Sequence, residues 1–157
     1  MELCLNEGEA MIVRRETETD RTKEHKLLEA MAGHLECNFK QNPNTHKYSI
    51  DGWFYSKTDN PEKGLMLGWA ECKWYSGKAH CFLNVAKYAE LMNLSLHSGI
   101  PSYFIVREPG RWGYINLTYE IGTPCVHEGG TPAGRQPNED DVEPLIKLDS
   151  DSIKWML

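Results

Sequence analysis

The sequence predicts an α/β domain with a mixed sheet, and two kinds of pattern lead to this prediction. Apolar residues recur at helical spacing in two segments, and runs rich in aromatic and branched side chains mark four strands. The predicted helices are 21–39 and 76–99, and the predicted strands are 46–56, 65–75, 101–108 and 111–121. One helix falls between strands, and this order is typical of a mixed α/β sheet.

The first predicted helix has one apolar side and begins near residue 21. Thr17 and Asp20 are both of a type that caps helix N-termini, and the sequence leaves the choice between them open. The apolar side consists of Leu27, Leu28, Met31 and Leu35. The segment "QNPNT" at 41–45 then ends the helix.

The first two predicted strands are separated by the loop 57–64, and the first of them is expected to enter a turn or hairpin at Asp51-Gly52. A second helix follows and ends at Gly99. Its expected apolar stripe is Phe82, Val85, Tyr88, Ala89, Met92 and Leu96. A turn at Pro109-Gly110 joins the last two strands.

The length of 157 residues suits one domain with one substantial core. We expect an N-terminal arm at 1–20, a core at 21–120 and a loop-rich C-terminal extension at 121–157. Glycine and proline are frequent in 122–141, which is predicted to be a long loop, while a last strand and a short turn can follow it. The sequence shows neither a long apolar span nor a signal-peptide pattern, so we expect a soluble, cytoplasmic protein without membrane contact.

The net charge of −6 is unusual for a protein that binds nucleic acid, because phosphate contacts need lysine and arginine. Most of the acidic residues, however, lie in the two ends, 1–36 and 128–157, where they can be remote from a basic face. The five cysteines form no CxxC pair and are predicted to be reduced thiols. A zinc site assembled from Cys72, His80, Cys81, Cys125 and His127 remains an alternative without a standard spacing.

The segment "GWAECKWY" at 68–75 places two opposite charges inside an apolar strand. Glu71 and Lys73 are two residues apart and therefore share a face. A buried charge must be satisfied by an ion pair, a metal ion or solvent in a cleft. Asp51, at the end of the neighbouring strand segment, can approach Glu71, and two carboxylates beside a lysine suit Mg²⁺ and phosphodiester hydrolysis. A simple ion pair, or an edge strand open to water, is the structural alternative.

Asp51 followed twenty positions later by Glu71-Cys72-Lys73, with a Glu-bearing helix before and a helix and "GIPSYFIVRE" after, resembles the PD-(D/E)XK nuclease superfamily. That superfamily includes restriction endonucleases, Holliday-junction resolvases and phage-type exonucleases. The resemblance covers about 20–117 and implies a restriction-endonuclease-like αβββαβ core, in which helices flank a central mixed sheet.

The resemblance also implies roles for individual residues. Asp51, Glu71 and the carbonyl group of Cys72 are the implied Mg²⁺ ligands, with Mn²⁺ as a substitute, and Lys73 is expected at the attacking water. Members often add a carboxylate from the first helix, for which Glu24 is the first choice and Glu29 the alternative.

Six further residues are candidates for substrate contact: Asn84, Tyr88, Lys87, Lys78, Arg107 and Arg111. Five aromatic residues could stack on bases, although strand aromatics more often pack against the sheet. They are Trp53, Trp69, Trp74, Tyr75 and Trp112. No chemistry is assigned to His25, His34 or His97.

The expected function is that of a metal-dependent DNA endonuclease or exonuclease that selects DNA structure or ends, in phage-type replication, recombination or repair, with a homodimer as one form and a virus as one source. The alternative is an inactive protein on the same scaffold that binds a nucleic acid, or a protein partner through its acidic surface. An intact Asp51, Glu71 and Lys73 set favours the enzyme.

Overall fold

The computed structural model describes residues 17–43, 50–58, 60, 63–119, 125–127 and 144–157. In chain order its elements are α1 (Glu18–His34), β1 (Asn38–Gln41), β2 (Gly52–Tyr55), β3 (Met66–Trp74), β4 (Phe82–Asn84), α2 (Val85–Ser98), β5 (Ser102–Glu108), β6 (Arg111–Asn116), β7 (Cys125–His127), β8 (Leu145–Lys147), a 3-10 turn (Ser150–Ser152) and β9 (Lys154–Met156). No helix in these ranges is long and apolar enough to cross a membrane.

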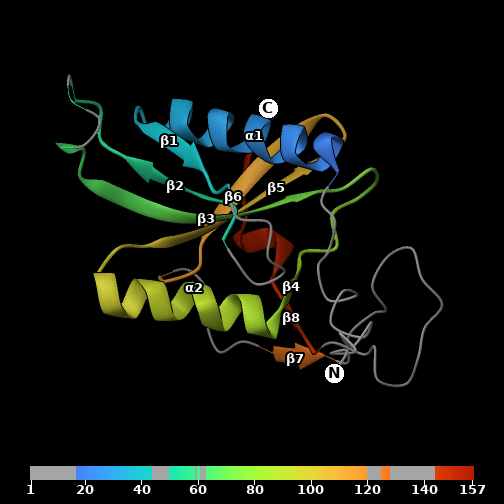
Figure 1. Cartoon of the computed structure of the whole chain (residues 1–157). Coiled ribbons are helices and arrows are strands. Elements are labelled where there is room, and N and C mark those ends of the chain that lie inside the picture. Colours follow the sequence, from blue (N-terminus) through green and yellow to red (C-terminus); the bar gives the residue numbers. More distant parts are fainter. Residues whose placement is uncertain (1–16, 44–49, 59, 61–62, 120–124, 128–143) are drawn as a thin grey trace, which may run out of the picture.

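A six-stranded mixed sheet, in the order β1-β2-β3-β5-β6-β9, forms the centre of the molecule. β3 and β5 run parallel, and the other neighbours in this sheet are antiparallel. Figure 1 shows α1 on one face of the sheet and α2 on the other. The predicted α/β class and the αβββαβ order of the core are therefore confirmed.

The face under α1 is an apolar layer. Leu28, Met31 and Phe54 are completely buried there, together with Ala70 and Cys72 of β3. Gly52 permits the close approach of α1, because a Cβ atom at this position would lie 2.6 Å from the Lys40 carbonyl oxygen and 2.8 Å from Leu28 Cδ1. The start of β2, and Asp51 before it, are thus held directly beneath α1.

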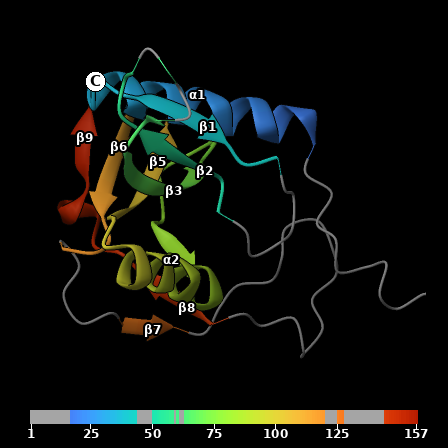
Figure 2. The ribbon, with the colours of Figure 1, turned by 60° about the vertical axis from the view of Figure 1, so that its left-hand side comes forward.

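The opposite face packs against α2 and a second, smaller sheet. This sheet has three antiparallel strands in the order β4-β8-β7, and Figure 2 shows it beside α2, away from the main sheet. Phe104 and Val106 of β5 and Leu91 of α2 are buried in this second core. α2 ends at Gly99, whose φ of 69° is in the left-handed region that glycine favours.

The structure corrects several predicted boundaries. α1 begins earlier than predicted, with Thr17 rather than Asp20 as its N-cap, and Asp20 completes a capping box. The helix also ends at His34, so the segment Asn38–Gln41 is a strand instead of the last turn of a helix. Asp51-Gly52 leads into β2 and is not a hairpin turn between strands.

The predicted helix at 76–99 was too long, because Phe82–Asn84 forms β4 and α2 starts only at Val85. Val85, Tyr88 and Met92 of its predicted stripe pack against the core, but the buried residues of α2 are Lys87, Leu91 and Ser95. Leu96, also in the predicted stripe, is 80% exposed. The predicted loop 122–141 contains β7, and its other residues lie outside the described ranges. The predicted last strand corresponds to β8 and β9.

Glu108, at the end of β5, forms a hydrogen bond with the loop that leads from β3 to β4. Its carboxylate accepts hydrogen bonds from the Ala79 backbone N–H at 2.8 Å and from Arg111 Nε at 2.6 Å. The Ala79 backbone hydrogen bond and the Arg111 side-chain hydrogen bond lower the pKa of Glu108 below its ordinary value of 4.5.

We expect Glu108 to make folding stability dependent on acid pH. A carboxyl whose pKa is lowered by folding stabilises the protein above its unfolded-state pKa, and this contribution is lost as the pH falls through the lowered value. Replacing Glu108 with Gln should cost about 1–3 kcal/mol at pH 7 and flatten the decline of unfolding free energy below pH 4.5. Urea unfolding of wild type and of the Gln variant at several pH values around and below 4.5 measures the unfolding free energy. If this free energy falls with pH as steeply in the variant as in wild type, Glu108 is not the source of the acid dependence.

Candidate functional site

Asp51 is fixed beside β3 through both its backbone and its side chain. Its N–H donates to the Ala70 carbonyl at 3.0 Å, and its carboxylate Oδ2 accepts a hydrogen bond from the Cys72 N–H at 2.7 Å. These two contacts lie on either side of Glu71 in the chain. The structure therefore brings Asp51 next to Glu71, as the sequence predicts.

Glu71 points to the α2 side of the sheet, where it meets Lys87. Its Oε2 lies 3.0 Å from Lys87 Nζ, and the two side chains are 13% and 10% exposed. This contact is an ion pair by distance, yet the buried Oε2 has no partner with hydrogen-bond geometry among the described residues. The oxygen is thus compensated by charge but not by a directed hydrogen bond.

Burial and charge act together on this pair. Burial raises the pKa of Glu71 well above its ordinary value, Asp51 raises it further, and Lys87 and Lys73 oppose the change. Burial alone would lower the pKa of Lys87, but Glu71 and Asp51 outweigh it and the pKa is raised. Lys87 is therefore an ammonium group, and the ionised form of Glu71 depends on a nearby cation.

Lys73 shares the face of Glu71, because the two residues are two positions apart in β3. Unlike Glu71, it is exposed, and its charge contributes to the pKa of Glu71. An exposed ammonium beside a buried carboxylate is free to contact a bound phosphate or a water molecule. Its predicted position next to the carboxylates agrees with this placement.

Hydrogen bonds connect the start of α1 to the segment that contains Asp51. Gln41 Nε2 donates to Glu24 Oε2 at 3.2 Å and to the Arg21 carbonyl at 3.0 Å. Asn42 donates from its backbone N–H to the Asp51 carbonyl at 2.8 Å, and Arg21 donates to the Asn42 carbonyl at 3.2 Å. The ends of α1, β1 and β2 are thereby tied together around Asp51.

Glu24 is half-buried and near enough to influence the site. Burial raises the pKa of Cys72 well above its ordinary value, and Asp51, Glu71 and Glu24 raise it further. Glu29, the alternative on the same helix, is exposed. Gln41 and Asn42 were missed by the sequence analysis, which interpreted their segment only as a helix-ending turn.

Within the described ranges, no three His, Cys, Asp or Glu side chains are arranged to hold one metal ion. The residues nevertheless fit a Mg²⁺ ion of the kind held by one or two carboxylates, water and substrate phosphate oxygens. Asp51 and Glu71 supply two carboxylates, and among the described residues the buried Oε2 of Glu71 is opposed only by the charge of Lys87, at 3.0 Å. N–H and C=O of one residue in an extended strand point to the same side, so the Cys72 carbonyl is directed to the Asp51 edge.

The predicted substrate-contact residues are spread over the molecule. Lys87 is buried against Glu71, and Asn84 caps α2 by accepting from the Ala86 and Lys87 N–H groups. Tyr88 packs on the second core. Neither Asn84 nor Tyr88 is presented as a free surface group.

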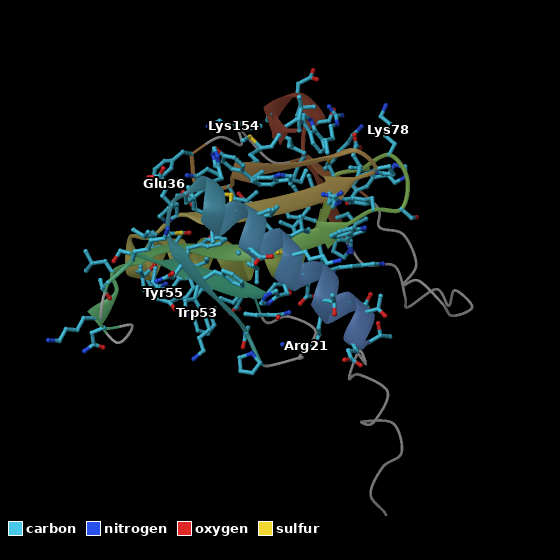
Figure 3. The ribbon with its side chains drawn as sticks, turned by 90° about the horizontal axis from the view of Figure 1, so that it is seen from above. Arg21, Glu36, Trp53, Tyr55, Lys78 and Lys154 are labelled. Atoms are coloured by element: carbon cyan, nitrogen blue, oxygen red, sulfur yellow. The ribbon has the colours of Figure 1, made fainter. Side chains whose placement is uncertain are left out.

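The other three candidates lie outside this cluster. Arg111 is bound to Glu108 and lies 3.9 Å from the Trp155 ring centre, and Arg107 lies 4.9 Å from that of Trp74. Lys78 is exposed on the loop after β3 and projects at the margin of the molecule far from Tyr55 in Figure 3.

The aromatic candidates are half-buried and pack on the two cores. Trp53, Trp69 and Tyr75 contact the core under α2, and Trp74 and Trp112 contact the core under α1. They are placed as packing residues of the sheet, which is the more common role.

The cysteines do not gather into a zinc site in the described part of the chain. Cys72 and Cys81 are free thiols in different cores, and His80 is exposed. The side chains of Cys125 and His127 lie outside what the structure describes. Cys72 lies in the core under α1 and Cys81 in the core under α2, and no metal-holding group includes either of them among the described residues.

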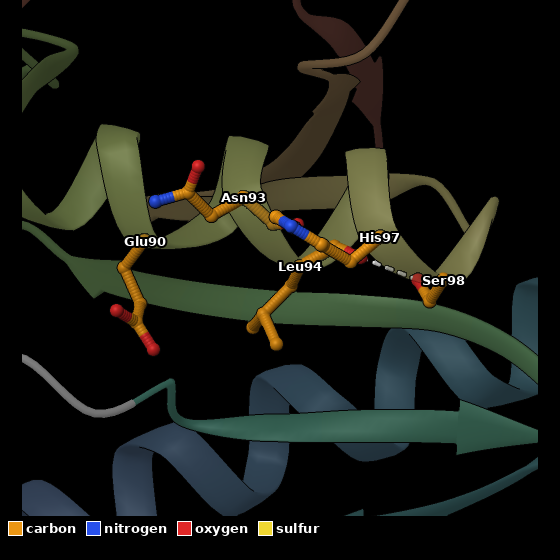
Figure 4. A pocket seen from close by; sticks show the side chains of 5 residues that line it. All are labelled: Glu90, Asn93, Leu94, His97 and Ser98. Atoms are coloured by element: carbon orange, nitrogen blue, oxygen red, sulfur yellow. Dashed lines mark hydrogen bonds between the residues drawn. The ribbon is translucent and has the colours of Figure 1, made fainter.

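A shallow hollow on α2 is separate from these residues. Figure 4 shows its lining, which comes entirely from α2 and consists of Glu90, Asn93, Leu94, His97 and Ser98. None of the predicted site residues contributes to it, so the candidate site is the charged cluster at β2, β3 and α2.

The elements and their order define a restriction-endonuclease-like α/β fold, with a carboxylate pair on adjacent strands of its sheet. The chain is similar to Hjc, a Holliday junction resolvase from the archaeal hyperthermophile Archaeoglobus fulgidus, with a TM-score of 0.49 and 12% identity. The match covers 83% of this chain and 86% of that chain. No family model and no curated protein matches the sequence.

Proposed function

We propose that the protein is a metal-dependent nuclease that hydrolyses phosphodiester bonds in DNA. The observation that carries this proposal is the carboxylate of Asp51 bound to the Cys72 N–H at 2.7 Å, directly beside the buried Glu71. Two carboxylates held by adjacent strands, with an ammonium on the same face, match the requirements of phosphoryl chemistry.

In this proposal Asp51 and Glu71 hold a Mg²⁺ or Mn²⁺ ion together with the Cys72 carbonyl group. The bound ion would polarise a phosphoryl oxygen and lower the pKa of water. Lys73 orients the attacking water and balances negative charge that develops on the phosphate. Glu24 belongs to the same group through its contact with Gln41.

The substrate class is part of the proposal. The described elements form one α/β unit around the charged cluster, which favours selection of DNA structure or DNA ends over a long base sequence. A homodimer would present two such sites to one substrate. Because the net charge is acidic, the exposed Lys73 beside the carboxylates is the first candidate for phosphate contact, and Lys78 is an exposed candidate outside the cluster.

The test is cleavage of labelled linear, nicked, single-stranded, flapped and four-way DNA in the presence of Mg²⁺ or Mn²⁺. Wild type is compared with Lys73→Ala and Glu71→Ala, and circular dichroism checks that all three proteins are folded. Metal-dependent cutting that both substitutions abolish supports the proposal and identifies the preferred DNA structure. Folded wild type that cuts none of these substrates would contradict it and favour a binding protein on the same scaffold.

A further inference from the structure

Lys87 is unusual because it is buried. Only 8% of the residue is exposed, and lysine is almost never fully buried unless it is paired. From the sequence, Lys87 was a candidate for substrate contact. The structure instead places its ammonium 3.0 Å from Oε2 of Glu71, on the side of the sheet that faces α2.

The position of Lys87 is fixed by the start of α2. Asn84 Oδ1 accepts hydrogen bonds from the Ala86 N–H at 2.7 Å and from the Lys87 N–H at 3.4 Å, so the first turn of the helix is capped. This turn contains no acidic residue of its own. The positive end of α2 and the Lys87 ammonium therefore both favour negative charge at Glu71.

An ammonium at this distance uses the same carboxylate oxygen that a divalent cation would need. Two positive groups on one buried oxygen repel each other strongly, because the surroundings screen charge less than water does. Binding of the cation therefore requires Lys87 to move away from Glu71 or to give up part of its interaction.

We propose that Lys87 is a resident counter-cation that competes with the divalent metal ion for Glu71. It offsets part of the negative charge of Asp51, Glu71 and Glu24 when no metal ion is bound, and it lowers the cation affinity of the free protein. Lys87 is thus a positioning residue of the site, and the inference rests on the metal site of the proposed function.

Mn²⁺ binding to the protein without DNA tests this inference, measured by isothermal titration calorimetry. Lys87→Met should bind Mn²⁺ at least about tenfold more tightly than wild type, which corresponds to about 1.4 kcal/mol. Lys87→Gln, which removes the charge but keeps a hydrogen-bond donor, should shift the affinity in the same direction. Lys87→Arg and the exposed control Lys147→Met should remain near wild type.

Thermal unfolding with and without metal is a second measurement. It distinguishes a lysine that competes with the metal ion from a lysine that only stabilises the fold. Without metal, Lys87→Met should melt at a lower temperature than wild type, because Glu71 loses its counter-charge. Saturating Mn²⁺ should then raise its melting temperature by more than it raises that of wild type.

The outcomes separate the two proposals. If wild type binds Mn²⁺ and cuts DNA, but removal of the Lys87 charge leaves the Mn²⁺ affinity unchanged or weaker, the counter-cation role is wrong and the nuclease proposal stands. If no variant binds Mn²⁺ although wild type cuts DNA, the counter-cation role alone is overturned. If none binds Mn²⁺ and folded wild type cuts none of the DNA substrates, both proposals are overturned.

Discussion

Replacing Asp51 with Asn should lower metal-dependent DNA cleavage by about a hundred- to a thousandfold while leaving the protein folded. Asn keeps an oxygen that can accept the hydrogen bond from the Cys72 N–H, now 2.7 Å from Asp51 Oδ2, but it removes the negative charge. The variant therefore separates the electrostatic role of Asp51 from its structural role. Initial rates on the best DNA substrate at saturating Mg²⁺ measure the effect.

Asp51→Ala and Asp151→Asn complete the comparison. Asp51→Ala also leaves the Cys72 N–H without its acceptor, so it should lose about 1–3 kcal/mol of unfolding free energy that the Asn variant retains. Asp151 is exposed near the C-terminus, and the same change of charge there should leave cleavage unaltered. Full activity of the folded Asp51→Asn protein would remove Asp51 from the proposed site.

Phe54→Ala should cost about 3–5 kcal/mol of unfolding free energy. Phe54 is completely buried under α1, where it packs with residues of the helix and of β3. This loss would be a large part of the unfolding free energy of a whole domain, which is typically about 5–15 kcal/mol. Guanidinium unfolding followed by tryptophan fluorescence provides the measurement.

Phe39 offers a matched control for this substitution. It lies opposite Phe54 on the neighbouring strand β1, but it is only half-buried and its ring is in edge contact with His25. Phe39→Ala should therefore cost clearly less than Phe54→Ala. Equal losses for the two variants would show that burial under α1 does not determine the stability of this layer.

The main elements were predictable because their patterns were strong. The apolar side of α1 contains Leu27, Leu28 and Met31, all of which are buried as expected. β1 and β4 were missed because each is short and lacks the alternation that identifies a strand; β1 reads Asn-Phe-Lys-Gln. Such strands are stabilised by their neighbours in the sheet, which a local pattern does not contain.

The buried residues of α2 could not be predicted, for a different reason. This helix carries apolar residues on all of its sides, and two of its three buried residues are polar. Ser95 is buried because its hydroxyl lies 2.7 Å from that of Ser102 on β5, and Lys87 is buried because Glu71 is its partner. Both explanations depend on partners that are distant in the sequence, so helical periodicity alone did not identify the most deeply buried positions.

The candidate site was also predictable only in part. Asp51, Glu71 and Lys73 were predictable as a group, since two lie on one strand and the third begins the strand beside it. The ion pair to Lys87 and the hydrogen bonds of Gln41 and Asn42 were not, because they join elements whose relative position depends on the complete sheet.

The parallel pairing of β3 with β5 implies an order of assembly for the charged cluster. β2 and β3 are antiparallel neighbours close in the chain, so Asp51 and Glu71 can meet through a short connection. Parallel strands need a long crossover, which here carries α2, and Lys87 reaches Glu71 only when that helix docks. We expect the carboxylates to come together early in folding and their ammonium partner to arrive late, so that the docking of α2 neutralises a repulsion already present in the nascent sheet.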